Sequence, residues 1–289
     1  MNTPFNFRLT KFPNEAEILR HEVREFLSDA LKDVPKETRA ETWYGADENF
    51  SRKVGQQGWI GLNWPKEHGG AGRSSMERYV ILEEMLTAGA PVGAHWISDR
   101  QSGPLIIRYG TEKHQKELLP GILKGESYFC IGMSEPDSGS DLAALRTKAE
   151  KKGDIYLVNG TKLWTSGAHR CQYMIALFRT SQEEDRHGGF SQFIVDLSLP
   201  GVTIRPIIDL AGRHHFNEVI FEDVEVPEDM LIGTEGNGWN QVTAELALER
   251  SGPERYLSSY MLLQELVNEF SNKNDDEGVT EIGRQMSHL

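Results

Sequence analysis

The residues best suited to chemistry lie in one stretch, residues 130–169, which contains two polar clusters. Residues 133–141 read MSEPDSGSD and residues 164–167 read WTSG. Turn signals at 152–154 and 159–160 flank a short predicted strand between the clusters, which is typical of a β-meander. A meander would bring hydroxyls and backbone amides close to an indole. That combination suits a flat heteroaromatic ligand, because the indole covers a face while hydroxyls and N–H groups bind the edge.

A carboxylate is the second candidate for chemistry. Residues 236–239 (GNGW) open a predicted long helix, and steps of three and four place Glu249 on its apolar stripe. A carboxylate in such a stripe is either paired internally, here with Arg250 or Arg255, or present for chemistry. Residues 251–253 (SGP) are expected to kink the helix. The stripe consists of Val242, Leu246, Tyr256, Tyr260, Leu263, Val267 and Phe270.

The adjacent pair His214-His215 raises the question of a metal site. Neighbouring residues in a strand point to opposite faces, and no Cys/His cluster accompanies the pair, so we predict no metal. The fingerprints GxGxxG and GxxxxGK[ST] are absent, so neither a Rossmann nor a P-loop nucleotide site is supported.

Periodicity divides the chain into three parts that would position these residues. We predict an α+β multidomain protein with an N-terminal all-α domain (1–127), a middle antiparallel β-domain (128–233) and the start of a truncated C-terminal helical bundle (234–289). A lone amphipathic helix cannot bury its own apolar face, so we expect either that the chain is truncated or that a partner completes the bundle. The predicted helices cover 14–34, 49–57, 74–85, 94–109 and 111–123, and the later strands cover 173–179, 192–196, 202–207 and 218–221.

Composition narrows the class of protein. The chain has 289 residues, a net charge of -13 and a pI near 5.2, which argues against nucleic acid and anionic membrane partners. Mean hydropathy is -0.49, no apolar run is long enough to span a bilayer, and no signal peptide is seen. Two cysteines cannot form a disulfide framework. We therefore expect an intracellular protein, in the cytoplasm or in an organelle matrix after import.

Both polar clusters resemble sequence segments of the acyl-CoA dehydrogenase family. Residues 64–70 (WPKEHGG) and 221–227 (FEDVEVP) also resemble segments of that family. The resemblance implies an FAD-dependent oxidoreductase of fatty acid and lipid degradation that acts on an acyl-CoA substrate. It also implies electron-transfer flavoprotein as the acceptor and a homo- or hetero-oligomer that completes the flavin site. By the resemblance, Ser140 touches the acyl-CoA, and the cofactor-binding residues are Ile131, Met133, Ser134, Trp164, Thr165 and Ser166.

The resemblance also implies a catalytic base. In most of the family this glutamate lies in the C-terminal bundle, beyond Leu289. A subset that includes isovaleryl- and long-chain-type enzymes places it on the helix that here carries Glu249, and Glu249-Arg250 sits where that subset has Glu-Arg. Glu249 would then take the α-proton while a hydride passes to flavin N5, and Arg250 would bind the substrate. Burial should raise the pKa of such a carboxylate toward that of a working base.

Two alternatives remain open at this point. A relative on the same scaffold could carry out oxygen chemistry, as an acyl-CoA oxidase or a flavin monooxygenase. The chain could also be a non-catalytic or partner-completed subunit of a heteromeric dehydrogenase. The acyl group is not readable from the sequence, although a base on this helix hints at a branched, long or bulky, even steroid-derived, acyl chain.

Overall fold

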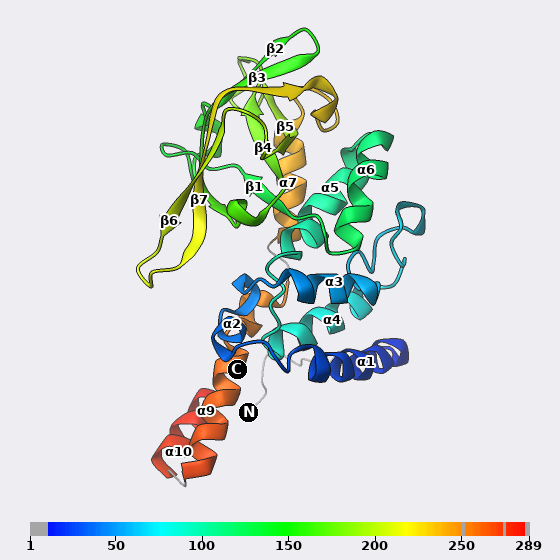
Figure 1. Ribbon diagram of the computed structural model, residues 1–289, viewed down its shortest axis with the longest axis vertical. Helices are drawn as coiled ribbons and strands as arrows, with labels where there is room; N and C mark the ends of the chain where they lie inside the picture. Colours follow the sequence, from blue (N-terminus) through cyan, green and yellow to red (C-terminus); the bar gives the residue numbers. More distant parts are fainter. Residues whose placement is uncertain (1–10, 250–251, 274–275, 287–289) are drawn as a thin grey trace, which may run out of the picture.

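The computed structural model describes residues 11–249, 252–273 and 276–286. A helical region comes first, a β-sheet follows it, and further helices end the described chain, so the predicted fold class is confirmed (Figure 1). The first region contains α1 (Asn14–Ala30), α2 (Lys36–Ala40), α3 (Glu48–Gln56), α4 (Ser75–Thr87), α5 (Gly103–Tyr109) and α6 (Glu112–Leu123).

Helix α4 begins where a capping residue stands. The Ser74 hydroxyl accepts from the Glu77 N–H, and the Glu77 carboxylate accepts from the Ser74 N–H, which forms a capping box. The predicted helix over 94–109 is shorter than expected. A π-helical turn at Ser98–Ser102 precedes α5, and Gly103 N–H bonds to Ser98 O. Pro104 cannot donate a backbone bond, and a wider turn is one way to accommodate that loss.

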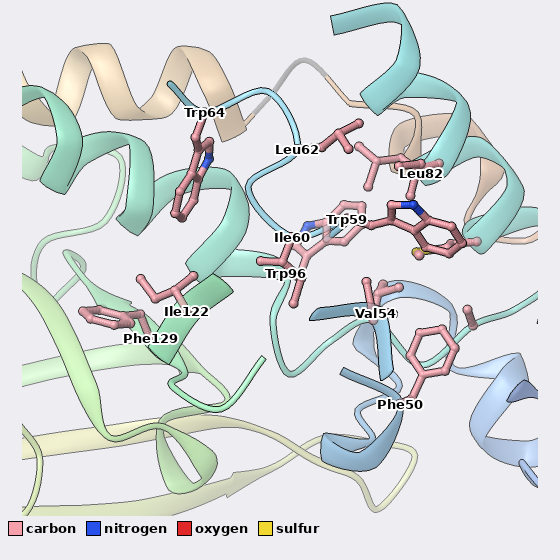
Figure 2. Close-up of a cluster of buried hydrophobic side chains, with 14 of the residues drawn as sticks. Phe50, Val54, Trp59, Ile60, Leu62, Trp64, Leu82, Trp96, Ile122 and Phe129 are labelled. Carbon is pink, nitrogen blue, oxygen red and sulfur yellow. The ribbon is translucent and has the colours of Figure 1, made fainter. Parts of the chain in front are cut away.

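The helices share a core with the inner face of the sheet. The buried residues of α1 recur on one face, as in an amphipathic helix, whereas α4 is buried around much of its circumference. Phe129, Ile175 and Ile194 come from strands and join the same cluster. Figure 2 shows part of it. Phe129 is drawn together with the helical residues Phe50, Val54, Leu82, Trp96 and Ile122 and with residues from the turns that follow α3, namely Trp59, Ile60, Leu62 and Trp64.

The sheet has the strand order β1-β4-β2-β3-β7-β6, with β5 paired to β4. Neighbouring strands in the sheet are antiparallel, with two exceptions. β4 pairs in parallel with β1, and it also pairs in parallel with β2 at a single residue pair. β3 and β7 are the longest strands, and their alternating burial gives the sheet one packed face. The strands are β1 (Phe129–Gly132), β2 (Lys148–Lys152), β3 (Ile155–Ser166), β4 (Tyr173–Arg179), β5 (Phe190–Asp196), β6 (Val202–Ile208) and β7 (His214–Pro227).

The turn predicted at Asn159-Gly160 is wrong. β3 continues through both residues, and the register with β7 shifts there in a bulge. The Asn159 side chain explains the shift, since it donates to the Asp223 carboxylate and accepts from the Asp223 N–H, both at 2.9 Å. Asp223 itself adopts a φ of 50°. Polar residues that signal a turn therefore stabilise a bulge here. The separately predicted segments 218–221 and 221–227 both lie within β7.

After the sheet come α7 (Gly238–Glu249), α8 (Glu254–Leu257), α9 (Tyr260–Lys273) and α10 (Asp276–Met286). The single long helix predicted here is wrong, because separate helices take its place. Pro253 lacks a backbone N–H and stands directly before α8, which fits the interruption. α7 lies beside β5, whereas α9 and α10 extend away from the sheet (Figure 1). The domain limits 127/128 and 233/234 stay predictions.

Candidate functional site

A backbone hydrogen bond joins the two polar clusters. Leu163 N–H, at the end of β3, donates to Ser134 O at 2.8 Å. The loop 133–141 is closed on itself by Glu135 and Ser138, whose backbones exchange hydrogen bonds. The structure therefore brings together the two clusters that the sequence analysis grouped, one on the loop after β1 and the other at the end of β3.

The peptide between Met133 and Ser134 has an occupied carbonyl and an N–H group without a partner among the described residues. Met133 O is occupied, because it accepts from the Lys162 ammonium at 3.1 Å. In a trans peptide the C=O and the following N–H point in opposite directions, so the Ser134 N–H faces away from Lys162. In the part of the chain that the structure describes, this N–H donates to no protein group. A half-buried donor in this state is suited to the edge of a bound ligand.

Trp164 is held outward by a strained backbone. Its side chain is 56% exposed, and its φ of 61° lies in the left-handed region. Such a conformation costs about 1–3 kcal/mol for a residue with a side chain. The indole packs against Phe216 edge to face, with ring centroids 5.9 Å apart, and leaves most of its surface open. An exposed, oriented indole provides a flat apolar surface beside the Ser134 donor.

The other predicted site residues occupy different environments. Ile131 lies in β1 and Ser166 at the end of β3, both half-buried, whereas Ser140 is exposed on the loop. Ser166 also borders a small cavity of about 50 Å³ between the sheet and Trp43. Thr165 is buried, and among the described residues its hydroxyl has no hydrogen-bond partner.

A buried ion pair under the loop was missed by the sequence analysis. Lys162 and Glu135 are 0% and 7% exposed, and their Nζ and Oε1 atoms lie 2.8 Å apart. Burial lowers the pKa of Lys162 to about 8, and Glu135 opposes that shift. Burial would raise the pKa of Glu135, but Lys162 and two backbone donors hold it below its usual value. The signal was strand alternation, which places Lys162 on the buried face with Tyr156 and Val158.

Two histidines near the site form a stacked pair. His169 and His214 stack with ring centroids 3.8 Å apart, and both face the Asn217 side-chain oxygen. Burial, together with the nearby His214 and Arg170, lowers the pKa of His169 to about 4. Asn217 in turn donates to Thr165 O at 3.0 Å, which holds the end of β3. In the described ranges no group of three His, Cys, Asp or Glu side chains could hold a metal ion.

Comparison with known proteins agrees with this geometry. The family models for the N-terminal and the middle domain of acyl-CoA dehydrogenases match residues 13–126 and 130–224. Acyl-CoA dehydrogenase FadE29 of Mycobacterium tuberculosis is 37% identical over 272 residues, which cover 93% of this chain and 69% of FadE29. The chain belongs to the acyl-CoA dehydrogenase family.

Solved structures of the family show the same fold. The Tcur3481-Tcur3483 steroid ACAD superposes with a TM-score of 0.83 at 30% identity, over 97% of this chain and 74% of that one. The ChsE4-ChsE5 complex from Mycobacterium tuberculosis superposes with a TM-score of 0.74 at 35% identity, over 83% of this chain and 61% of that one. The chain thus spans about three fifths to three quarters of the acyl-CoA dehydrogenases compared here.

Helix α7, which carries the predicted base of this acyl-CoA dehydrogenase, packs beside the loop. Val242 belongs to a small buried cluster against which both Leu246 of α7 and Met133 of the loop pack. The backbone of α7 runs through Glu249, but the Glu249 side chain lies outside the described part, as does Arg250. Both roles stay predictions.

A second acidic residue of α7 was not considered in the sequence analysis. Glu245 is 2% exposed and accepts from Gln192 Nε2 at 2.9 Å. It precedes Glu249 by four residues, so the two share one helix face. Glu249 is therefore not the only acidic residue on that face of α7. Separately, within the described residues no helix is both long and apolar enough to cross a bilayer.

Proposed function

We propose that the chain carries out FAD-dependent α,β-dehydrogenation of an acyl-CoA thioester, in an assembly where further polypeptide completes the flavin site. One observation carries this proposal. The free Ser134 N–H lies on the loop 133–141 and the exposed Trp164 indole lies near the end of β3, and the hydrogen bond from Leu163 N–H to Ser134 O joins these two segments. An edge donor beside a flat apolar surface is what a flavin ring requires.

The residues present fit FAD. Ser134 N–H and the Ser166 hydroxyl would bond the ring edge, Trp164 would cover a face, and Ile131 and Met133 would contribute backbone groups. The Thr165 hydroxyl supports a ligand nearby, because a buried hydroxyl without a partner costs about 1–3 kcal/mol. When bound, FAD would supply the acceptor for the hydride.

The chain's own chemical task would be proton abstraction. We propose that Glu249 abstracts the α-proton of the thioester and that Arg250 and Ser140 contact the acyl-CoA. The packing of Met133 and Leu246 on one cluster supports this, since it sets α7 beside the flavin loop. A carboxylate enclosed between apolar side chains and a flavin would have a raised pKa, as a general base needs.

The neighbours suggest the substrate and the partner. One is named a steroid ACAD and another a complex of two different proteins. We extend both features to this chain, as a bulky, steroid-derived acyl group and a heteromeric assembly. A partner-completed role is also supported by Leu262 and Leu266 of α9, which are 47% and 48% exposed. Electron-transfer flavoprotein is our choice of electron acceptor.

The test is turnover by the purified assembly. Acyl-CoA and an artificial electron acceptor are supplied, and the mass of the thioester is measured by mass spectrometry before and after the reaction. The proposal expects loss of one hydrogen from each of the α and β carbons, without stoichiometric hydrogen peroxide. Peroxide formed in step with product would indicate an oxidase instead, and an unaltered thioester with every acyl group tried would refute both.

The cofactor placement has its own test. Trp164→Ala removes the face contact, so the assembly should retain less flavin after gel filtration than wild type does. Trp164→Phe keeps an aromatic face and serves as the control. Equal flavin content in wild type and in Trp164→Ala would show that the flavin ring does not bind against the Trp164 indole.

A further inference from the structure

Lys162 and Glu135 lie directly beneath the loop proposed to hold the flavin ring, yet neither faces the ligand side. Both are charged at neutral pH, because the pKa of Lys162 is lowered only to about 8 and that of Glu135 is lowered as well. The Lys162 ammonium also lies over the Phe178 ring, 5.6 Å from its centroid. Lys162 and Glu135 therefore form a buried ion pair in which each charge faces the opposite charge of its partner.

The pair connects separate segments of the chain. The Glu135 carboxylate accepts the N–H groups of Arg146 and Thr147, at 2.6 and 2.9 Å. Lys162 donates from β3 to Met133 O and to Glu135 Oε1. The residues on both sides of Ser134 are therefore tied to β3 and to the segment that enters β2.

Stability alone gives a poor reason for this arrangement. Desolvating two charges costs several kcal/mol per ion, and well-packed apolar replacements of buried pairs are often neutral or stabilising. Apolar side chains at both positions could fill the same volume. They could not hold the Met133 carbonyl, which the Lys162 ammonium occupies.

The orientation of one peptide depends on that contact. With Met133 O turned to Lys162 and Ser134 O taken by Leu163 N–H, the Ser134 N–H is left pointing to the ligand side. A cation on the carbonyl also polarises the peptide, which makes its N–H a stronger donor. Lys162 thus acts on the position and the strength of the donor together.

We propose that the buried Lys162–Glu135 pair is a positioning device that aims the Ser134 N–H at the edge of the flavin ring and thereby sets flavin affinity and reduction potential. The proposal rests on the function proposed above. Neither residue touches the ring, so their effect passes through the Met133–Ser134 peptide.

Three variants separate positioning from folding. Lys162→Met leaves Glu135 buried and unpaired, so it should both destabilise the fold and weaken flavin binding. The double variant Lys162→Met with Glu135→Gln removes both charges and keeps a side-chain oxygen for the N–H groups of Arg146 and Thr147, so it should regain part of the stability that Lys162→Met loses. The matched control is Lys151→Met with Glu228→Gln, which removes an exposed ion pair at the other end of the sheet, between β2 and the residue after β7.

The measurements are made on the assembly that contains the chain, with FAD as the probe. They are the urea unfolding midpoint, the dissociation constant of FAD and the reduction potential of the bound flavin. We expect the double variant to unfold at a higher urea concentration than Lys162→Met does, to bind FAD at least about tenfold more weakly than wild type, and to show a more negative potential. Tenfold corresponds to about 1.4 kcal/mol, near the net value of one hydrogen bond. The control should bind FAD as wild type does.

Two results would overturn the proposal, and they differ. If the double variant binds FAD with wild-type affinity and potential while wild type itself binds FAD, the pair is structural and the proposed function is untouched. If the wild-type assembly binds no FAD, the proposed function fails and the positioning role fails with it.

Discussion

At the scale of single residues, His95 makes stability depend on pH. It is 5% exposed, and its Nδ1 lies 2.8 Å from the Ser51 hydroxyl. Burial lowers the pKa of His95 to about 4, Asp99 opposes the shift and Arg78 adds to it. The unfolded chain gains this proton near its usual pKa of about 6.5. The contribution of neutral His95 to the free energy of unfolding is therefore complete above about pH 6.5 and is lost as the pH falls to about 4.

We predict that wild type loses up to about 3 kcal/mol of unfolding free energy across that window through His95. His95→Asn cannot titrate and should lose correspondingly less. Urea unfolding of both proteins at about pH 7 and about pH 4.5 measures the difference. Equal losses in the two proteins would show that His95 is not the group responsible.

The proposed base gives a second prediction at this scale. Glu249→Gln keeps the size of the side chain but loses its basicity, so flavin reduction by acyl-CoA should slow by about a hundred- to ten-thousand-fold. Flavin and acyl-CoA should still bind. Glu245→Gln changes the other carboxylate on the same face of α7, and it is compared with Glu249→Gln in the same assay. If Glu245→Gln abolishes reduction and Glu249→Gln does not, the roles are reversed.

Residue types predicted part of the site. The hydroxyls, the indole and their loops were readable because each cluster is local in sequence. Lys162 and Glu135 were not singled out, since an isolated charge in a strand is usually read as exposed, and their pairing depends on a contact across 27 residues. The free Ser134 N–H was out of reach, because the direction of a peptide group has no sequence signal.

At the scale of elements, the bulge between β3 and β7 was misread as a turn. Asn and Gly favour left-handed backbone in both settings, and only the partner strand distinguishes them. We predict that Asn159→Ala lowers the unfolding free energy by about 1 kcal/mol, through loss of its two hydrogen bonds to Asp223. Asn240→Ala, an exposed helical asparagine, is the control for urea unfolding. A variant as stable as the control would mean that the bulge does not depend on this side chain.

The helices after the sheet show the same limit. Periodicity predicted an apolar stripe from 242 to 270, yet α7, α8 and α9 are separate. A stripe marks which residues face a core, and it does not require one straight axis. Helix starts were predicted better, because the caps Ser74 and Thr111 act within one turn.

At the scale of the whole molecule, α9 and α10 present an apolar groove of about 830 Å³. Leu262, Leu266 and Phe270 line it. We predict that the isolated chain self-associates through this surface, and that Leu262→Glu with Leu266→Glu shifts it toward monomer in sedimentation. Leu210→Glu, at a fully exposed loop position, should change nothing. A wild-type chain that sediments as a stable monomer would contradict the prediction.

The central claim is that acyl-CoA reduces a flavin held between the loop of Ser134 and the end of β3 at Trp164. The most direct measurement is the absorbance of the flavin in the purified assembly, recorded without oxygen while a panel of acyl-CoA thioesters, steroid-derived ones included, is added. The account predicts that at least one thioester bleaches the oxidised flavin band in proportion to the amount added. An assembly that holds flavin and is bleached by dithionite, but by none of the thioesters, would contradict it.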